Sequence, residues 1–368
     1  MKITGLRLGR IKVPLTTPFK TAIRTVNEID DLIVILETDG PLFGIGSTPS
    51  TPHITGCDHK LTSQMIEQFV FPAIKGCDIT EIRENTKRVQ ASTEKANNAK
   101  SAIEIALYDL WSKQLNLPLS KALGGSLEEI QTGITISANP VFDMIADIEK
   151  AIAKGYRLMK LKCGTEPAAD QSRLTKIFHF VATLRQKTEL MIDANQGWTT
   201  EQTLYIMRQL ESAGMVFKAL EQPVKHNDLK GLLAIKEAIT TPLMVDETCF
   251  NLKQATYLLD KGIANQINVK LVKSAGISEA IKIGQLGEQR LIPCMMGCML
   301  EGAIGVAAAA HVAAAFPVQF KYVDLDGPTL GQYNPIDQGT RFEKSKVYLN
   351  KTPGLGISKI PTLSPNRC

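Results

Sequence analysis

Short stretches rich in β-forming residues recur along the greater part of the chain at nearly regular intervals. They begin 24 to 32 residues apart, at residues 133–138, 158–162, 190–194, 217–220, 243–246, 267–271, 291–295 and 320–324. Helical patterns separate most of them, for example at 201–214 and 251–262. Strands that alternate with helices at this interval form a parallel sheet with helices outside, and eight such strands close a barrel. The sequence therefore predicts an α/β protein built around a (β/α)8-type barrel or a close variant of it.

The residues before this repeat are predicted to form a smaller α+β unit. Residues 3–14 and 31–38 are expected to be strands, and the polar stretch 17–30 between them is too long for a tight hairpin. Residues 100–115 predict a strong amphipathic helix, which leads into the stop signal PLSKALGG at 118–125. We therefore expect an N-terminal α+β capping domain at 1–125, a barrel at 126–330, and a C-terminal segment at 331–368 that packs back to complete the capping domain.

Composition argues against several classes of function. The 368 residues carry a net charge of +5 without a Lys/Arg block, which predicts neither nucleic-acid binding nor a polybasic membrane surface. The longest apolar run, 302–318, is mostly alanine and contains His311, so we expect a packed helix rather than a membrane span. The N-terminus lacks the apolar core of a signal peptide. Seven scattered cysteines predict a reducing, cytoplasmic location without a disulfide scaffold, and Cys294 and Cys298 lack the second pair that a zinc site needs.

Two lysines lie two residues apart in the second predicted strand, within the sequence RLMKLKCG at 157–164. The spacing sends the side chains of Lys160 and Lys162 to the same face of the strand. Two like charges that face a protein interior are costly unless anionic groups compensate for them. We therefore expect carboxylates on the neighbouring strands to lie opposite this pair.

Three such carboxylates end the third, fourth and fifth predicted strands. They are Asp193 in MIDANQGW, Glu221 in ALEQP and Asp246 in MVDET. Side chains at the carboxyl ends of barrel strands converge on one face. A single buried acid is usually a cap or an ion-pair partner, but three at equivalent positions on consecutive strands can share one cation. Oxygen ligands alone favour Mg²⁺ over zinc.

A third lysine, Lys270, ends the sixth predicted strand. The second and sixth strands lie across a ring of eight, so Lys162 and Lys270 would face opposite sides of one substrate carbon. One lysine could then remove a proton and the other return it on the opposite face, which is the geometry of racemisation or epimerisation. Burial and a nearby cation would lower the lysine pKa toward the working range of a general base. The alternatives are that Lys270 is a solvated strand-end residue, or that the nearby Lys273 replaces it, although Lys273 would not share that face.

The eighth predicted strand ends in YVDLDGP, where Asp324 and Asp326 are two residues apart and share a face. A pair of anions at a substrate site most simply binds a substrate cation, such as an α-ammonium group. The alternative is a pair of loop-capping aspartates before Gly327 and Pro328.

The motifs KxK, DAN, EQP, DE and the lysine in INVKLVKSAG resemble those of the enolase superfamily, within it the two-lysine subgroup named for muconate lactonizing enzyme. The Asp-x-Asp on the last strand resembles that of dipeptide epimerases, and CMMGCMLEG lacks the His–Asp dyad of the mandelate racemase kind. The resemblance implies that Lys162 and Lys270 alternate as acid and base around an enediolate, and that Mg²⁺ binds the substrate carboxylate. It also implies substrate contacts from Lys160, Thr135, Asn195 and Cys298.

Substrate preference is expected to come from capping-domain loops near 15–30 and 47–60. Arg24 resembles the arginine that pairs with the glutamate side chain in L-Ala-D/L-Glu epimerases, although a solvated surface arginine is the alternative. The expected function is thus Mg²⁺-dependent interconversion of L-Ala-L-Glu and L-Ala-D-Glu, a peptidoglycan fragment, by a protein expected to be a homo-oligomer. The alternatives are epimerisation of hydrophobic or cationic dipeptides, N-acylamino acid racemisation, o-succinylbenzoate formation, cycloisomerisation, or metal-dependent dipeptide binding without catalysis.

Overall fold

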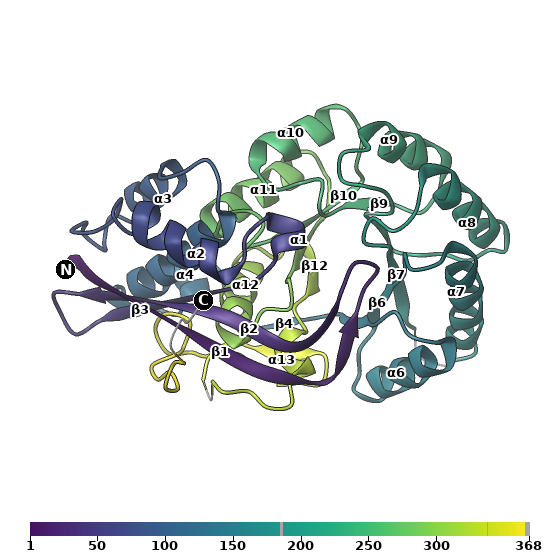
Figure 1. Ribbon diagram of the computed structural model, residues 1–368. Helices are drawn as coiled ribbons and strands as arrows, with labels where there is room; N and C mark the ends of the chain where they lie inside the picture. Colours follow the sequence, from purple (N-terminus) through teal and green to yellow (C-terminus); the bar gives the residue numbers. More distant parts are fainter. Residues whose placement is uncertain (185–186, 337, 365–368) are drawn as a thin grey trace.

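A barrel of eight parallel strands forms the larger part of the molecule, and an antiparallel sheet with helices lies beside it (Figure 1). The computed structural model describes residues 1–184, 187–336 and 338–364. The barrel strands follow one another around the ring in chain order. They are β5 (Ile134–Ile136), β6 (Leu158–Lys162), β7 (Glu189–Asp193), β8 (Leu220–Glu221), β9 (Leu243–Val245), β10 (Gln266–Lys270), β11 (Cys294–Gly297) and β12 (Phe320–Asp324). The Gly133 N–H donates to the Val323 carbonyl at 2.8 Å and joins the two ends of the ring. The predicted fold class is confirmed.

Two barrel strands begin three residues later than the apolar pattern predicted. The fourth begins at Leu220 instead of 217, and the seventh at Cys294 instead of 291. Leu291 has a positive φ of 56° and is 90% exposed, so it belongs to the turn before the strand. Phe217 is buried in the connection that precedes its strand. Hydrophobicity alone does not separate a strand from the loop residues that enter it.

A helix follows each of the first seven barrel strands. These helices are α6 (Val141–Ala153), α7 (Pro167–Ala182), α8 (Thr200–Ser212), α9 (Leu229–Ala238), α10 (Leu252–Asp260), α11 (Ile277–Gln289) and α12 (Ala303–Ala315). The eighth strand is followed by the one-turn α13 (Gly327–Leu330). Helix α12 is buried along nearly its whole length, including His311, as expected of a packed helix. Among the described residues, no helix has the length and apolarity needed to cross a membrane.

A long hairpin dominates the capping domain. Strands β1 (Ile3–Lys20), β2 (Thr25–Thr38) and β3 (Phe43–Pro49) form its antiparallel sheet. The prediction of a long, irregular connection at 17–30 is wrong, because the strands continue until only residues 21–24 remain as the turn. The polar residues lie on a two-stranded ribbon beyond the sheet, where cross-strand ion pairs such as Lys12–Glu28 at 2.5 Å are available to them.

Short helices complete the capping domain around one long central helix. They are α1 (Pro52–Thr55), α2 (His59–Met65), the π-helical turn Ile66–Val70, α3 (Ile82–Ala91) and α5 (Leu119–Ala122). The central α4 (Asn97–Gln114) was predicted to be amphipathic, but it is buried on all sides because it packs between β3 and the barrel. Strand β3 approaches it so closely that a Cβ on Gly46 would lie 2.0 Å from the Ala102 carbonyl oxygen.

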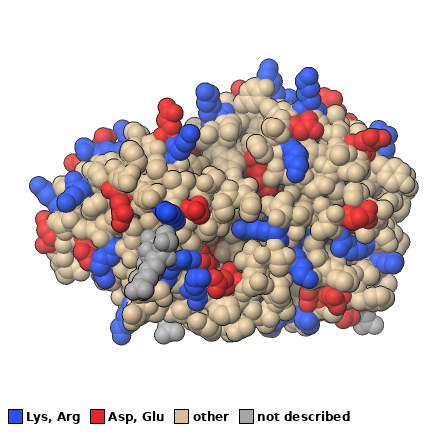
Figure 2. Space-filling model, in the orientation of Figure 1, with Lys and Arg blue, Asp and Glu red and all other residues tan. Residues whose placement is uncertain are grey.

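The C-terminal segment contacts both parts of the molecule. Strands β13 (Arg341–Glu343) and β14 (Lys346–Tyr348) pair with β4 (Glu129–Gln131), which precedes the barrel. Further on, the Leu355 N–H donates to Asp109 on α4 at 2.8 Å, and Ser364 bridges to Arg10 on β1. On the face shown in Figure 2, Lys and Arg are interspersed with Asp and Glu rather than gathered by sign.

Candidate active site

The ends of the barrel strands bring the predicted lysines and carboxylates together. The parallel register places Lys162 opposite Asp193, and Asp193 opposite Glu221. Asp246 follows β9 directly, and Lys270 is the last residue of β10. Each of these side chains belongs to a residue that is at most 6% exposed. These side chains lie close together because residues at equivalent positions on paired parallel strands are neighbours.

Each metal-ligand candidate of the aspartate type pairs with a lysine. Asp193 Oδ2 lies 2.5 Å from Lys162 Nζ, and Asp246 Oδ2 lies 2.6 Å from Lys270 Nζ. The other Asp246 oxygen is 2.6 Å from the ammonium of Lys273, which is fully buried. A small inner pocket lies at the carboxyl ends of the barrel strands, and Lys270 lines it whereas Lys273 does not. Lys273 therefore holds the Asp246 carboxylate from the side away from the pocket. Lys270 faces the space in which a substrate would lie.

The carboxylates around Lys160 and Lys270 act against the lowering of the lysine pKa that burial would cause. Burial does act against the charge of Lys270, but Asp246 and other carboxylates outweigh it and raise its pKa. Lys160 behaves in the same way. Its ammonium contacts Asp324 and lies 3.5 Å from Glu221 Oε2, and its pKa is held well above the usual value despite burial. Both lysines are ammonium ions in this state.

Two buried glutamates in the wall have raised pKa values. Glu221 accepts a hydrogen bond from Asn268 Nδ2 at 2.8 Å, and the sequence analysis missed Glu247, which the DE of MVDET contains. Burial first, and then neighbouring carboxylates, raise the pKa of Glu221 to about 7 and that of Glu247 to about 8. The Oε2 atoms of both are buried, with no hydrogen-bond partner among the described residues.

These carboxylates suit a hard divalent cation. As the side chains stand, no three His, Cys, Asp or Glu residues in the described part of the chain are gathered closely enough to hold a metal ion. The reason is that Asp193 and Asp246 turn toward lysines. The donor set is nonetheless oxygen-only, and the Oε2 atom of Glu221, which has Lys160 at 3.5 Å but no hydrogen-bond partner among the described residues, could bind a cation directly. The residues present fit Mg²⁺.

The last strand contributes the second predicted pair of carboxylates. Thr135 on the first barrel strand donates its backbone N–H to Asp326 Oδ2 at 2.7 Å, and its hydroxyl donates to Asp324 Oδ1 at 3.3 Å. Burial and the adjacent Asp324 raise the pKa of Asp326 to about 7. Within the described residues, Asp326 makes no side-chain cap to the helix that it precedes. The pair faces the pocket, so the loop-capping alternative does not account for it.

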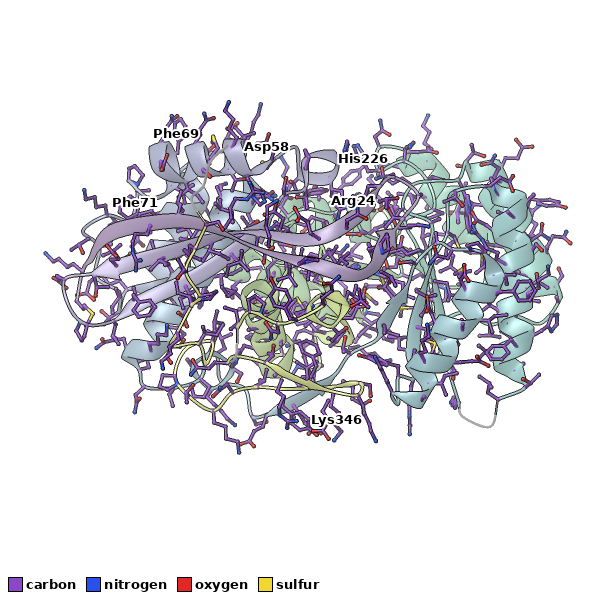
Figure 3. The ribbon with its side chains drawn as sticks, turned by 60° about the horizontal axis from the view of Figure 1, so that its bottom comes forward. Arg24, Asp58, Phe69, Phe71, His226 and Lys346 are labelled. Atoms are coloured by element: carbon purple, nitrogen blue, oxygen red, sulfur yellow. The ribbon has the colours of Figure 1, made fainter. Side chains whose placement is uncertain are left out.

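The remaining predicted residues line the same pocket. Arg24 lies at the end of the hairpin that reaches over the barrel (Figure 3), and its Nη2 donates to the Met299 carbonyl at 3.4 Å. Asn195 has a φ of 43°, and its N–H donates to Asp193 at 3.0 Å. Cys298 also lines the pocket, and burial raises the pKa of its thiol well above the usual value. The predicted substrate-lining residues are thus brought together.

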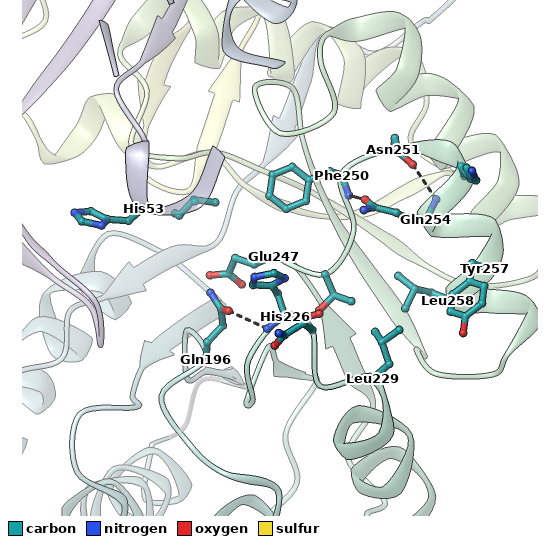
Figure 4. Close-up of a pocket in the computed structure, with 14 residues that line it drawn as sticks. His53, Gln196, His226, Leu229, Glu247, Phe250, Asn251, Gln254, Tyr257 and Leu258 are labelled. Atoms are coloured by element: carbon teal, nitrogen blue, oxygen red, sulfur yellow. Dashed lines mark hydrogen bonds between the residues drawn. The ribbon is translucent and has the colours of Figure 1, made fainter. Parts of the chain in front are cut away.

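A wider cleft adjoins this inner pocket. The inner pocket has a volume of about 50 Å³, whereas the cleft beside it has about 700 Å³. Figure 4 shows the cleft, with His53 of α1 on one side and His226 of the loop after β8 on the other. Ile54 and Glu247 line both spaces. The cleft therefore opens directly beside the lysines and is covered in part by the capping domain.

Comparison with known families accounts for both parts of the chain. Residues 4–124 match the mandelate racemase / muconate lactonizing enzyme N-terminal domain, and residues 143–360 match the enolase C-terminal domain-like family. The chain belongs to the enolase superfamily. It is 36% identical to the L-Ala-D/L-Glu epimerase of Clostridium acetobutylicum, over 98% of this chain and 99% of that one.

Two solved structures of enolase-superfamily epimerases are similar along the whole chain. The substrate-liganded L-Ala-D/L-Glu epimerase of Bacillus subtilis has a TM-score of 0.94 at 35% identity, covering 98% of this chain and all of that one. The dipeptide epimerase of Enterococcus faecalis, complexed with Mg and L-Leu-L-Tyr, has a TM-score of 0.92 at 35% identity with the same coverage. With these relatives and its paired lysines, this member of the enolase superfamily is an isomerase of the epimerase type.

Proposed function

We propose that this enzyme is a Mg²⁺-dependent epimerase that interconverts L-Ala-L-Glu and L-Ala-D-Glu. The observation that carries the proposal is the placement of Lys162 and Lys270, which come from strands four apart in a ring of eight and line one pocket. A Cα–H bond held between them can lose its proton to one lysine and regain a proton from the other on the opposite face. This is a 1,1-proton transfer at the α-carbon of the C-terminal residue.

The residues around the lysines have separate tasks. Asp324 and Asp326 would bind the α-ammonium group of the dipeptide, and Lys160 would offset the negative charge that develops on the substrate carboxylate. Asp193, Glu221 and Asp246 would hold Mg²⁺, which supplies positive charge to that carboxylate and makes the α-proton more acidic.

Six free cysteines in the described part of the chain support our placement of the enzyme in the cytoplasm.

Lys270 must be released from its carboxylate before it can act as a base. Lys162 lies 2.5 Å from Asp193 and Lys270 lies 2.6 Å from Asp246, and Asp246 raises the pKa of Lys270 and so favours its ammonium form. When Asp246 binds another cation, it stabilises the ammonium form of Lys270 less, and the neutral amine of Lys270 becomes accessible. The ion pairs thus keep the lysines in place until the site is loaded.

An acidic C-terminal side chain is favoured by Arg24. Its guanidinium is partly buried at the pocket, and the described contact is one long hydrogen bond to the Met299 carbonyl. A carboxylate could form a bidentate pair with it. The second candidate is a hydrophobic dipeptide, because Phe19, Ile23 and Leu330 line the same region and a relative was solved with L-Leu-L-Tyr.

Reactions on substrates that lack an ammonium group receive less support. N-acylamino acid racemisation, o-succinylbenzoate formation and cycloisomerisation would leave Asp326 buried beside the substrate without a cationic partner among the described residues, because the ammonium of Lys160 pairs with Asp324. Non-catalytic dipeptide binding would leave both pocket lysines without a role and does not agree with the epimerase relatives.

Proton NMR of L-Ala-L-Glu in D₂O, with enzyme and Mg²⁺, tests the proposal. We expect the Glu α-proton signal to disappear while L-Ala-D-Glu accumulates, and we expect a metal chelator to stop both changes until Mg²⁺ is restored. The double variant Lys162→Ala/Lys270→Ala is the matched control for contaminating activity. A faster reaction of L-Ala-L-Leu than of L-Ala-L-Glu would favour the hydrophobic candidate. Failure of both dipeptides to exchange would refute the dipeptide assignment.

A further inference from the structure

Two buried carboxylates outside the pocket each hold the turn that follows a lysine-bearing strand. Glu104 belongs to capping helix α4, and Asp170 belongs to barrel helix α7. Both residues are 0% exposed, and neither lines the inner pocket. A buried carboxylate costs free energy unless its hydrogen bonds are satisfied, so the partners of these two show what they stabilise.

Glu104 fastens the start of helix α11. Its Oε1 accepts hydrogen bonds from Gln90 Nε2 and from the Ser278 hydroxyl, both at 2.7 Å, and its Oε2 accepts from the Ser278 N–H at 2.9 Å. The same Gln90 nitrogen donates to the Ala275 carbonyl at 2.8 Å. Side chains of two capping-domain helices, α3 and α4, therefore hydrogen-bond to the connection that leads from Lys270 into α11.

The backbone of this connection has two residues with positive φ, which these hydrogen bonds stabilise. Ala275 has a φ of 59° and Gly276 a φ of 127°, values that few residues adopt without support. A Cβ on Gly276 would lie 2.4 Å from Glu104 Oε2, so glycine is what admits the carboxylate. Asn97 Nδ2 also donates to the Lys273 carbonyl at 2.6 Å, so the capping domain contacts this connection closer to the end of the strand as well.

Asp170 hydrogen-bonds in the same way to the turn that follows Lys162. Its Oδ2 accepts from the Gly164 N–H at 2.8 Å and from Trp198 Nε1 at 2.9 Å, and its Oδ1 pairs with Arg173. Gly164 is two residues beyond Lys162 and has a φ of 92°. Trp198 lies in the loop after the strand that carries Asp193. Asp170 thus ties together the turns behind Lys162 and its carboxylate partner.

We infer that Glu104 is a positioning residue for Lys270 and Asp170 a positioning residue for Lys162, so that each controls proton abstraction from one epimer only. The inference rests on the proposed function. A misplacement of about 1 Å in a reacting group can cost on the order of 10²-fold in rate. Loosening one turn should therefore weaken one lysine while the lysine on the other side of the pocket keeps its geometry.

Deuterium exchange separates the two lysines. A lysine that takes the α-proton becomes an ammonium, exchanges with D₂O and returns a deuteron to the same face of the enediolate. This cycle needs one lysine, whereas net epimerisation needs both. Exchange measured from L-Ala-L-Glu therefore reports on one lysine, and exchange measured from L-Ala-D-Glu reports on the other. Lys162→Ala and Lys270→Ala show which epimer belongs to which lysine.

The test measures initial α-proton exchange from each epimer in Glu104→Gln and Asp170→Asn. We expect Glu104→Gln to slow exchange 10- to 100-fold, by the estimate above, for the epimer that Lys270→Ala identifies, with less than about threefold change for the other. Asp170→Asn should show the reverse preference. Asp109→Asn is the matched control, because Asp109 is also a 0% exposed acid on α4, but its partners are the Ile45 and Leu355 N–H groups and the Lys113 ammonium, none of which follows a lysine-bearing strand.

Two milder variants guard against misfolding. Ser278→Ala removes one hydrogen bond to Glu104, and Trp198→Phe removes one to Asp170. Ser278→Ala should slow the same epimer as Glu104→Gln, and Trp198→Phe the same epimer as Asp170→Asn, each by a smaller factor. Equal slowing of both epimers by Glu104→Gln and Ser278→Ala would overturn the inference, as would the same asymmetry in Asp109→Asn. Absence of exchange from both epimers in the unmodified enzyme would instead overturn the proposed function.

Discussion

The barrel wall and the end of the capping hairpin hold their polar side chains in different ways. The wall lysines and carboxylates belong to residues at most 6% exposed, and they are locked by strand register and by ion pairs of 2.5 to 2.6 Å. Arg24 at the hairpin end is only partly buried, and its described hydrogen bond is 3.4 Å long. Under the proposed function, the barrel wall would supply the proton chemistry, and the end of the hairpin would select the side chain of the substrate.

The largest effect is expected from the wall. Lys270→Ala should lower net epimerisation at least about 10²- to 10⁴-fold, because a general acid–base group is lost and one proton transfer has no substitute. The rate is measured by polarimetry or NMR with L-Ala-L-Glu. Lys218→Ala, which removes a lysine from the ion pair with Glu189 at the other end of the barrel, is the control and should retain activity. Retention of epimerisation within tenfold by Lys270→Ala would remove this lysine from the mechanism.

An intermediate effect is expected from the hairpin. Arg24→Ala should reduce kcat/KM for L-Ala-L-Glu about 10- to 100-fold, the equivalent of a charged hydrogen bond worth about 1.5–3 kcal/mol. The value for L-Ala-L-Leu should change little, and so should thermal stability, since the described hydrogen bond of the guanidinium is a single contact of 3.4 Å to the Met299 carbonyl. Lys20→Ala, on the same hairpin, is the control. Equal losses for both dipeptides would show that Arg24 supports the pocket rather than recognising a carboxylate.

The smallest effect on catalysis, but a distinct effect on stability, is expected where the hairpin meets the barrel. Asp31 on β2 accepts a hydrogen bond from the Gly302 N–H at 2.9 Å, and burial followed by Glu301 and Asp30 raises its pKa to about 8. Because the folded state holds this proton more tightly than the unfolded chain, the stabilisation is complete below about pH 4 and is lost as the pH rises toward 8.

Asp31→Asn keeps an acceptor for the Gly302 N–H and cannot ionise. Relative to the native enzyme, the variant should therefore gain unfolding free energy between pH 5 and pH 9, by up to about 1.4 kcal/mol for each pKa unit removed. Urea denaturation at the two pH values measures the difference. A parallel pH dependence in both proteins would show that Asp31 is ionised in the fold.

Some of the fold lay beyond the reach of pattern reading. The apolar Leu291 suggested a strand but lies in a turn, and the polar residues between 17 and 30 suggested a loop but form a cross-paired ribbon. Helix α4 looked amphipathic and is buried all round. For the ribbon and for α4, the deciding factor was a partner distant in sequence, which a local pattern cannot contain. For Leu291 it was the local turn, in which its N–H donates to the Glu288 carbonyl.

The sequence by itself determined which side chains meet at the barrel mouth. Strand spacing and the two-residue alternation bring Lys160, Lys162 and Lys270 to one rim with Asp193 and Glu221, because paired parallel strands align their ends. Only the tertiary structure decided which lysine pairs with which carboxylate, and that Glu104 and Asp170 hold the turns behind them. Those contacts join separate elements, so they depend on how helices and loops pack and not on any local repeat.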